Sequence, residues 1–223
     1  MANKMFWRYL AAAALVFTAA VQLFAVQKPR VYEEKAVRML EDFGRHLSTY
    51  DALHLEFIYD VAEAQIAYEE TTSGFLFTQG DKYYMKLGAM HFLSDGETAW
   101  SYLEEVNEVH ISLPEYTEGA ITPASLFTNV QDTFRPLWIR EEQIGDDAVQ
   151  ILDLVARDHQ VFYKYRVAID TENHQIHYII AYDRQGGSYT YTIEKMTTNP
   201  EIPEGLFVFN PDDYPGIEIV DLR

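Results

Sequence analysis

The sequence predicts an α+β fold that is mainly antiparallel β-sheet, with one helix near the N-terminus. Apolar residues recur at helical spacing over a long stretch before residue 50, and from Leu53 onward they recur mostly every second residue. Turn-forming pairs such as Asp95-Gly96 and Gly186-Gly187 separate these short runs. Because no stretch alternates strands with long helices, a parallel α/β sheet is not expected.

The first 25 residues have the layout of a secretory signal peptide. Lys4 and Arg8 precede an apolar stretch, and small residues allow cleavage after Ala20 or Ala25. An uncleaved membrane anchor is the alternative, because the apolar stretch is close to the shortest length that spans a bilayer. We therefore expect an exported, periplasmic protein with a single domain over residues 26–223.

The segment from Glu33 to Tyr50 is expected to form an amphipathic helix. Charged residues occupy one side, and Glu33 and Glu34 lie in the first turn, where negative charge suits the helix dipole. The other side carries apolar residues at three- and four-residue spacing. These are Ala36, Val37, Leu40, Phe43 and Leu47.

About ten strands follow, interrupted by one short helix. Thr122 and Pro123 form a typical helix start, and the apolar residues of this helix are Leu126, Phe127 and Val130. A sheet of this length tends to curl into a closed or half-open barrel.

Aromatic residues alternate along several of the expected strands. Five pairs show this pattern: Phe57 and Tyr59, Phe75 and Phe77, Trp100 and Tyr102, Tyr163 and Tyr165, and Tyr189 and Tyr191. These side chains could simply fill a core between sheet and helices. Their number on a curved sheet also leaves room for an apolar pocket.

The composition excludes several classes of function. The formal net charge of −18 argues against a nucleic-acid partner, and the absence of cysteine excludes disulfides and thiol chemistry. The sequence has no known nucleophile, metalloprotease or phosphate-loop motif. His174 and His177 would point to opposite sides of a strand. We therefore expect no catalytic residues, no metal, no cofactor and no enzymatic activity.

Three motifs resemble those of the periplasmic outer-membrane lipoprotein carrier family (LolA-like). A Gly-led strand begins with Gly74-Phe75-Leu76-Phe77, and a hairpin reads Ser94-Asp95-Gly96-Glu97-Thr98-Ala99-Trp100-Ser101-Tyr102. Phe207-Val208-Phe209-Asn210-Pro211 resembles the closing strand of the family. One departure concerns the turn Gln79-Gly80-Asp81, which lacks the arginine that latches the lid in the best-known carriers.

The resemblance implies an unclosed β-barrel with helices that cover an apolar cavity. It also implies a monomeric carrier that binds the acyl chains of lipoproteins, with an inner-membrane release complex and an outer-membrane acceptor as partners. A membrane-anchored or regulatory lipid-sensing module of the same fold is the alternative. The residues expected to line the cavity are Phe57, Tyr59, Phe75, Phe77, Met85, Trp100, Tyr102, Leu126, Phe127 and Val130.

Overall fold

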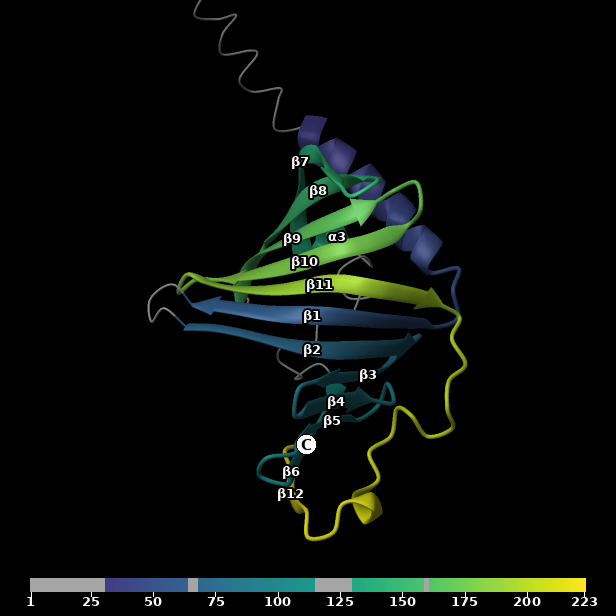
Figure 1. The fold of residues 1–223 in the computed structure, drawn as a ribbon, viewed down its shortest axis with the longest axis vertical. Coiled ribbons are helices and arrows are strands. Elements are labelled where there is room, and N and C mark those ends of the chain that lie inside the picture. Colours follow the sequence, from purple (N-terminus) through teal and green to yellow (C-terminus); the bar gives the residue numbers. More distant parts are fainter. Residues whose placement is uncertain (1–30, 64–67, 115–129, 159–160) are drawn as a thin grey trace, which may run out of the picture.

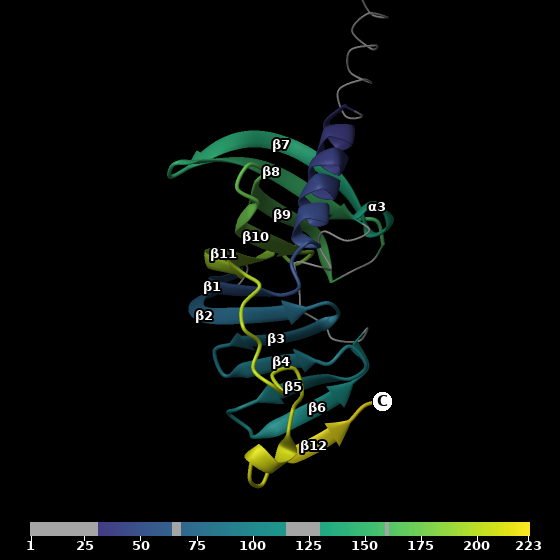
Figure 2. The same cartoon turned by 90° about the vertical axis from the view of Figure 1, so that its right-hand side faces the viewer.

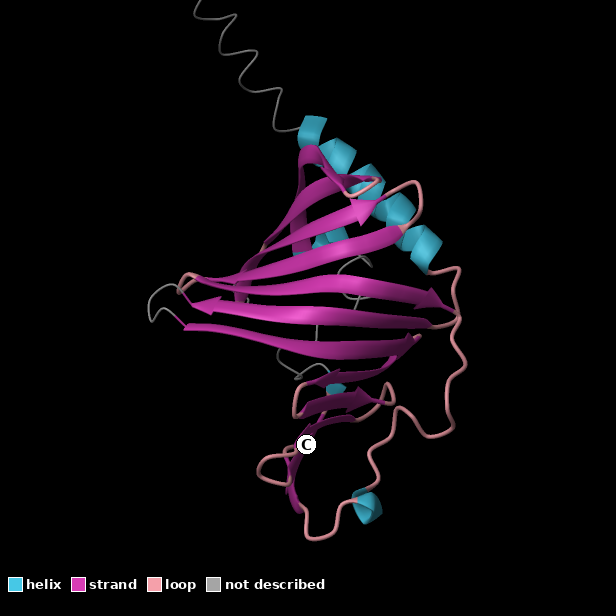
Figure 3. Ribbon diagram, viewed as in Figure 1, coloured by secondary structure: helices cyan, strands magenta, loops and turns pink. Residues whose placement is uncertain are grey.

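The computed structural model describes residues 31–63, 68–114, 130–158 and 161–223. Strands dominate these residues, and Figure 3 shows them as one continuous curved sheet with a long helix across one end. The expected signal peptide and the expected helix residues Leu126 and Phe127 lie outside the described residues. In the part of the chain that is described, no helix is both long enough and apolar enough to cross a bilayer.

The sheet contains twelve strands in the order β12-β6-β5-β4-β3-β2-β1-β11-β10-β9-β8-β7 (Figure 1). Their bounds are β1 Leu53–Glu63, β2 Tyr68–Gln79, β3 Lys82–Leu87, β4 Met90–Ser94, β5 Ala99–Leu103, β6 Glu108–Ser112, β7 Phe134–Ile144, β8 Asp147–Ala156, β9 Phe162–Asp170, β10 Gln175–Asp183, β11 Gly187–Thr198 and β12 Glu218–Asp221.

Neighbouring strands are antiparallel, except that β12 pairs in parallel with β6. The strands β7 and β12 end the order without pairing to each other, so the sheet is not closed. Register shifts between Glu56 and Phe57 and between Ile176 and Tyr178 mark irregularities that increase local twist and bend the sheet. The predicted fold class, a mainly antiparallel and unclosed sheet with an N-terminal helix, is confirmed.

The N-terminal helix is described over residues 31–47 and lies across the β7–β11 end of the sheet (Figure 2). Its residues Ala36, Leu40 and Phe43 have at most 1% of their surface exposed and pack against β8, β9 and β10. The helix was predicted to reach Tyr50, but it ends at Leu47. There, Thr49 and Tyr50 donate to carbonyls only three residues back, so the last turn tightens.

The edge strand β7 was not predicted from the sequence. Its second half, from Ile139 to Gln143, is exposed or half-buried and includes Arg140, Glu141 and Glu142. Pro136 lies within this strand, which is tolerated because an edge strand has one side without ladder hydrogen bonds. A polar edge strand has no apolar alternation to reveal it.

The chain after β11 runs past the part of the sheet formed by β1 to β6 to reach β12 (Figures 1 and 2). The motif with Phe207 and Phe209 was expected to form a closing strand, and this was wrong because both residues lie in turns and coil. The short 3-10 helix η2 (Pro211–Asp213) follows them. Phe207 and Phe209 are nevertheless buried, so they serve as packing residues rather than as part of the sheet.

Candidate functional site

The sheet has two faces, and we call the one that carries the N-terminal helix the inner face. Residues paired across antiparallel strands lie on the same face, so the register assigns each side chain. Val167 on β9, Ile179 on β10 and Tyr191 on β11 form one row, and Tyr191 pairs with Tyr59 on β1. The inner face therefore continues from the strands under the helix to β1 and beyond.

On β1 to β4 the inner face carries a second apolar surface, which we call the inner apolar surface. A second row on this face runs from Leu55, four residues before Tyr59 on β1, through Leu76 and Met85 to Phe92. The buried members of this surface are Leu55, Phe57, Leu76, Tyr83, Met85 and Leu87. The half-buried members that pack against them are Tyr59, Phe92, Tyr191, Ile193 and Met196.

Two tyrosines join the inner apolar surface to the packing under the helix. The ring centroids of Tyr59 and Tyr191 are 4.8 Å apart, and Phe57 meets Tyr191 edge to face at 5.4 Å. The Tyr191 hydroxyl donates a hydrogen bond to that of Tyr59. Burial raises the pKa of Tyr59 to about 12, and burial also raises the pKa of Tyr191. Both rings are neutral at physiological pH and present mostly apolar area.

The structure divides the predicted site residues between the two faces. Phe57, Tyr59 and Met85 belong to the inner apolar surface. Val130 is buried in the short helix α3 (Val130–Thr133) and packs within the cluster that includes the N-terminal helix. Binding of lipid to these four residues stays a prediction.

Phe75, Phe77, Trp100 and Tyr102 lie on the opposite, outer face. Phe75 pairs with Glu56 and Phe77 with His54, which alternate with the inner residues of β1. One cavity on the inner face therefore cannot be lined by all of the predicted residues. The strands that carry these residues were placed correctly, but the alternation within a strand does not reveal which of its faces continues onto the neighbouring strands.

The outer aromatic residues have other packing partners. Tyr102 lies 5.3 Å from Phe209 and 4.5 Å from Tyr214, measured between ring centroids, so the chain after β11 covers β5. The rings of His54 and Phe77 stack at 3.9 Å. These contacts pack Tyr102 and Phe77 against neighbouring rings on the outer face.

A pocket of about 520 Å³ lies over β1, β2 and β3. Its walls combine charged side chains with the rings of Phe57 and Phe75, and most lining side chains come from the outer face. Two of the charged lining groups are paired: Lys86 contacts Glu104, and Glu56 contacts Lys195 at 3.0 Å. A hydrocarbon chain fits poorly beside these charges.

The sequence-based site list omitted four half-buried members of the inner apolar surface. Tyr191, Ile193 and Met196 come from β11, and Phe92 comes from β4. The pairing of β1 with β11 joins residues more than 120 positions apart, for example Tyr59 with Tyr191. Only the alternation of Tyr189, Tyr191 and Ile193 could have indicated this contribution.

One group of side chains among the described residues could hold a metal ion. Asp147, Asp170 and His177 each offer a ligand atom, and these atoms lie within 4.8 Å of one another. Asp147 and Asp170 alternate with the inner residues of their strands, so the group is separate from the inner apolar surface.

The family model of "Outer membrane lipoprotein carrier protein LolA" matches residues 48–210, which is most of the described sheet. The chain belongs to the LolA family. The match includes every strand from β1 to β11, and hence the whole inner apolar surface. The description of the LolA family is that of a carrier rather than an enzyme, and it concerns lipid-modified proteins.

Three solved structures are similar to the chain at low sequence identity. An uncharacterized conserved protein from Thermus thermophilus has a TM-score of 0.58 and 12% identity, over 84% of this chain and 99% of that one. An outer membrane lipoprotein-sorting protein domain from Vibrio parahaemolyticus has a TM-score of 0.46 and 14% identity, covering 79% of this chain and 97% of that one. A LolA superfamily protein from Nitrosomonas europaea has a TM-score of 0.42 and 13% identity, with coverages of 78% and 97%. No curated protein matches the chain.

Proposed function

We propose that this protein is a periplasmic carrier that binds the acyl chains of lipoproteins on its inner apolar surface. It would take them from an inner-membrane release complex to an outer-membrane acceptor. The observation that carries the proposal is the half-buried apolar surface of β1, β4 and β11, which lies within the segment that matches the LolA family.

The energetics explain why such a surface is needed. Each methylene moved out of water contributes about 0.8 kcal/mol, so a sixteen-carbon chain contributes roughly 12 kcal/mol. A lipoprotein therefore does not leave a bilayer for water without a carrier that replaces this contact. Side chains such as Tyr191, Ile193 and Met196 offer apolar area on the same face as Tyr59.

Release would follow from the same side chains. Transfer to an acceptor requires that the carrier hold the acyl chains less tightly than the acceptor does. The hydroxyl groups of Tyr59 and Tyr191 make this part of the surface less apolar than a wall of aliphatic residues. A moderate affinity for acyl chains is the expected consequence.

Two substitutions on β1 test the proposal with a matched control. Tyr59 lies on the inner face, and its neighbour Ile58 lies on the outer face with a similar half-buried environment. A synthetic triacylated lipopeptide is mixed with each folded variant, and soluble complex is measured by gel filtration. We expect Tyr59→Glu to weaken capture by at least about tenfold, because a carboxylate beside an acyl chain loses hydration. Ile58→Glu should capture lipopeptide like the wild type.

Either of two results would contradict the proposal: full capture by a folded Tyr59→Glu variant, or equal loss in both variants. N-terminal sequencing of the exported protein tests the periplasmic location. A mature end at residue 21 or 26 is expected for a soluble carrier, whereas a retained first segment would favour the membrane-anchored sensor.

A further inference from the structure

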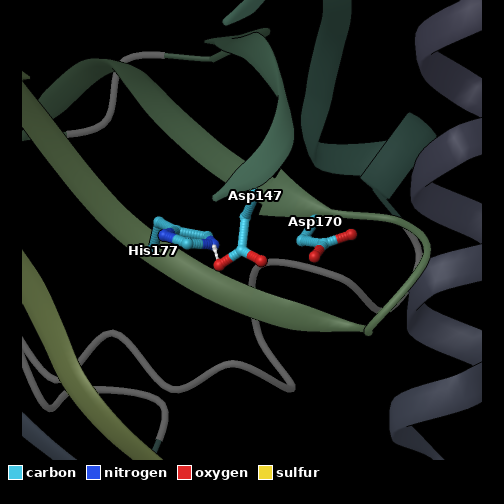
Figure 4. Close-up of side chains that lie close together, drawn as sticks. All are labelled: Asp147, Asp170 and His177. Carbon is cyan, nitrogen blue, oxygen red and sulfur yellow. Dashed lines mark ion pairs between the residues drawn. The ribbon is translucent and has the colours of Figure 1, made fainter. Parts of the chain in front are cut away.

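Three neighbouring strands bring two carboxylates and an imidazole together at one end of the sheet. Asp147 is the first residue of β8, Asp170 is the last of β9, and His177 lies near the start of β10. Figure 4 shows Asp147 between the other two side chains, and their ligand atoms all lie within 4.8 Å of one another. Because each side chain comes from a different strand, the sheet itself positions the group.

His177 is held in an unusual way. It lies at the register shift between Ile176 and Tyr178, where the extra residue redirects a side chain. Its Nε2 atom is fully buried and, among the described residues, makes no hydrogen bond. The nearest acidic atom is Oδ2 of Asp147 at 3.5 Å, which is longer than a hydrogen bond should be. A buried imidazole nitrogen normally has a hydrogen-bond partner or a metal ion, and the described residues provide no hydrogen bond here.

The carboxylate of Asp170 is held in place by hydrogen bonds and can still accept one more donor or a metal ion. It has 2% of its surface exposed. Its Oδ1 accepts from the amides of Glu172 and Asn173, and its Oδ2 accepts from the side-chain amide of Asn173 at 2.7 Å. Its Oδ2 keeps a second lone pair.

Asp147 supplies access from solvent, because 43% of its side chain is exposed. The two carboxylates of the group lie close together, and a divalent cation bound between them would balance their charge. One imidazole nitrogen with two carboxylate oxygens is a donor set that suits Zn²⁺ or Mn²⁺, and water would fill the remaining positions.

We propose that Asp147, Asp170 and His177 form a divalent-cation site that ties together β8, β9 and β10. The ion would be structural, since Asp147 and Asp170 lie on the face opposite to the inner apolar surface. The β9–β10 turn also supports the helix, because the rings of His174 and His46 stack at 3.5 Å. An ion at this place would therefore stiffen the support of the N-terminal helix.

The test uses the full mature chain after treatment with EDTA. Zinc chloride and manganese chloride are titrated separately by calorimetry, and thermal unfolding is followed with and without each metal. We expect one equivalent of at least one metal to bind and to raise the melting temperature. Asp147→Asn and His177→Gln should each weaken metal binding by more than about tenfold. Loss of a residue that only hydrogen-bonds to a metal ligand usually costs about tenfold in affinity already, and loss of a ligand should cost more.

Two nearby substitutions serve as controls. Asp146→Asn alters the adjacent exposed carboxylate, and His174→Asn removes the other histidine of this region, at a position whose φ of 55° asparagine tolerates. Both controls should bind like the wild type. Absence of binding up to millimolar metal, binding that survives Asp147→Asn and His177→Gln, or loss in His174→Asn would each overturn the proposal. Lipopeptide capture does not enter this readout, so the two proposals can fail independently.

Discussion

The ring of Phe57 lies directly over Gly74, its partner on the neighbouring strand. A Cβ atom on Gly74 would come within 2.7 Å of this ring and within 2.6 Å of the carbonyl oxygen of Lys86. The missing side chain of Gly74 thus lets Phe57 fold back against β2. The glycine that begins the family-like motif has a packing role in the inner apolar surface.

Gly74→Ala is therefore expected to destabilise the protein by about 1–3 kcal/mol, because the methyl group overpacks a filled site. Replacing glycine by alanine usually stabilises a protein by a few tenths of a kcal/mol or more, because the unfolded chain has less conformational freedom. A net loss of stability would therefore show that the clash dominates. Urea unfolding measures the effect. Ser73→Ala, one residue away on the outer face, should change stability little, and a stable Gly74→Ala variant would contradict the packing role.

Asp153 and Arg166 form a largely buried ion pair on the outer face. Two hydrogen bonds of 2.7 and 2.9 Å join them, and 10% of the Asp153 side chain is exposed. Asp153→Ala leaves Arg166 and Lys164 without this carboxylate, and we expect a loss of about 3 kcal/mol. The exposed pair Lys195–Glu56 is the comparison, and Glu56→Ala should cost less than about 1 kcal/mol in the same unfolding experiment. Equal losses would show that burial does not decide the contribution.

Acid should destabilise the protein in part through Asp183. Burial raises the pKa of Asp183, but hydrogen bonds from the amides of Gly187 and Gln185 and from Tyr189 lower it below its ordinary value of 3.8. As the pH falls, Asp183 therefore takes up a proton in the unfolded chain before it does so in the folded chain. Its contribution to the unfolding free energy is complete above pH 3.8 and is lost as the pH falls further. Unfolding free energies between pH 6 and about pH 3 should fall less steeply for Asp183→Asn. Parallel curves for variant and wild type would refute this.

Alkali should act through the buried tyrosines in the opposite direction. Burial raises the pKa of both Tyr59 and Tyr165 to about 12. Because these values exceed the ordinary value of 10.0, the two tyrosines ionise in the unfolded chain at a lower pH than in the folded chain. Their contribution to the unfolding free energy is complete below pH 10.0 and is lost as the pH rises toward about 12. Spectrophotometric titration should show tyrosines that ionise late, and Tyr59→Phe should remove one of them. A titration in which all tyrosines ionise near 10.0 would contradict the burial of these hydroxyls.

Strand positions could be predicted from the sequence because each depends on local alternation. Leu53 to Val61 and Tyr83 to Leu87 alternate clearly, and both form strands where expected. The Asp95-Gly96 turn likewise connects β4 to β5 through hydrogen bonds from Glu97 and Thr98 to the Asp95 carboxylate. These signals involve residues only a few positions apart.

The composition of the site could not be predicted in the same way. Phe57 and Phe75 are equally apolar, yet the register of β1 with β2 puts them on opposite faces. The register also places Trp100 and Tyr102 on the outer face, where the distant Phe209 and Tyr214 pack against this part of the sheet, so apolar character did not mark the inner face. The contribution of Tyr191 depends on the pairing of β11 with β1, which brings the two halves of the chain together.

The late position of β12 in the chain has a consequence for biogenesis. Until Glu218 to Asp221 have been made, β6 has an open edge, and before Phe209 arrives Tyr102 lacks its cover. A nascent or prematurely terminated polypeptide would expose apolar aromatic rings beside an unpaired strand edge. This combination favours aggregation. Quality control would therefore act most strongly on chains that stop before Phe209.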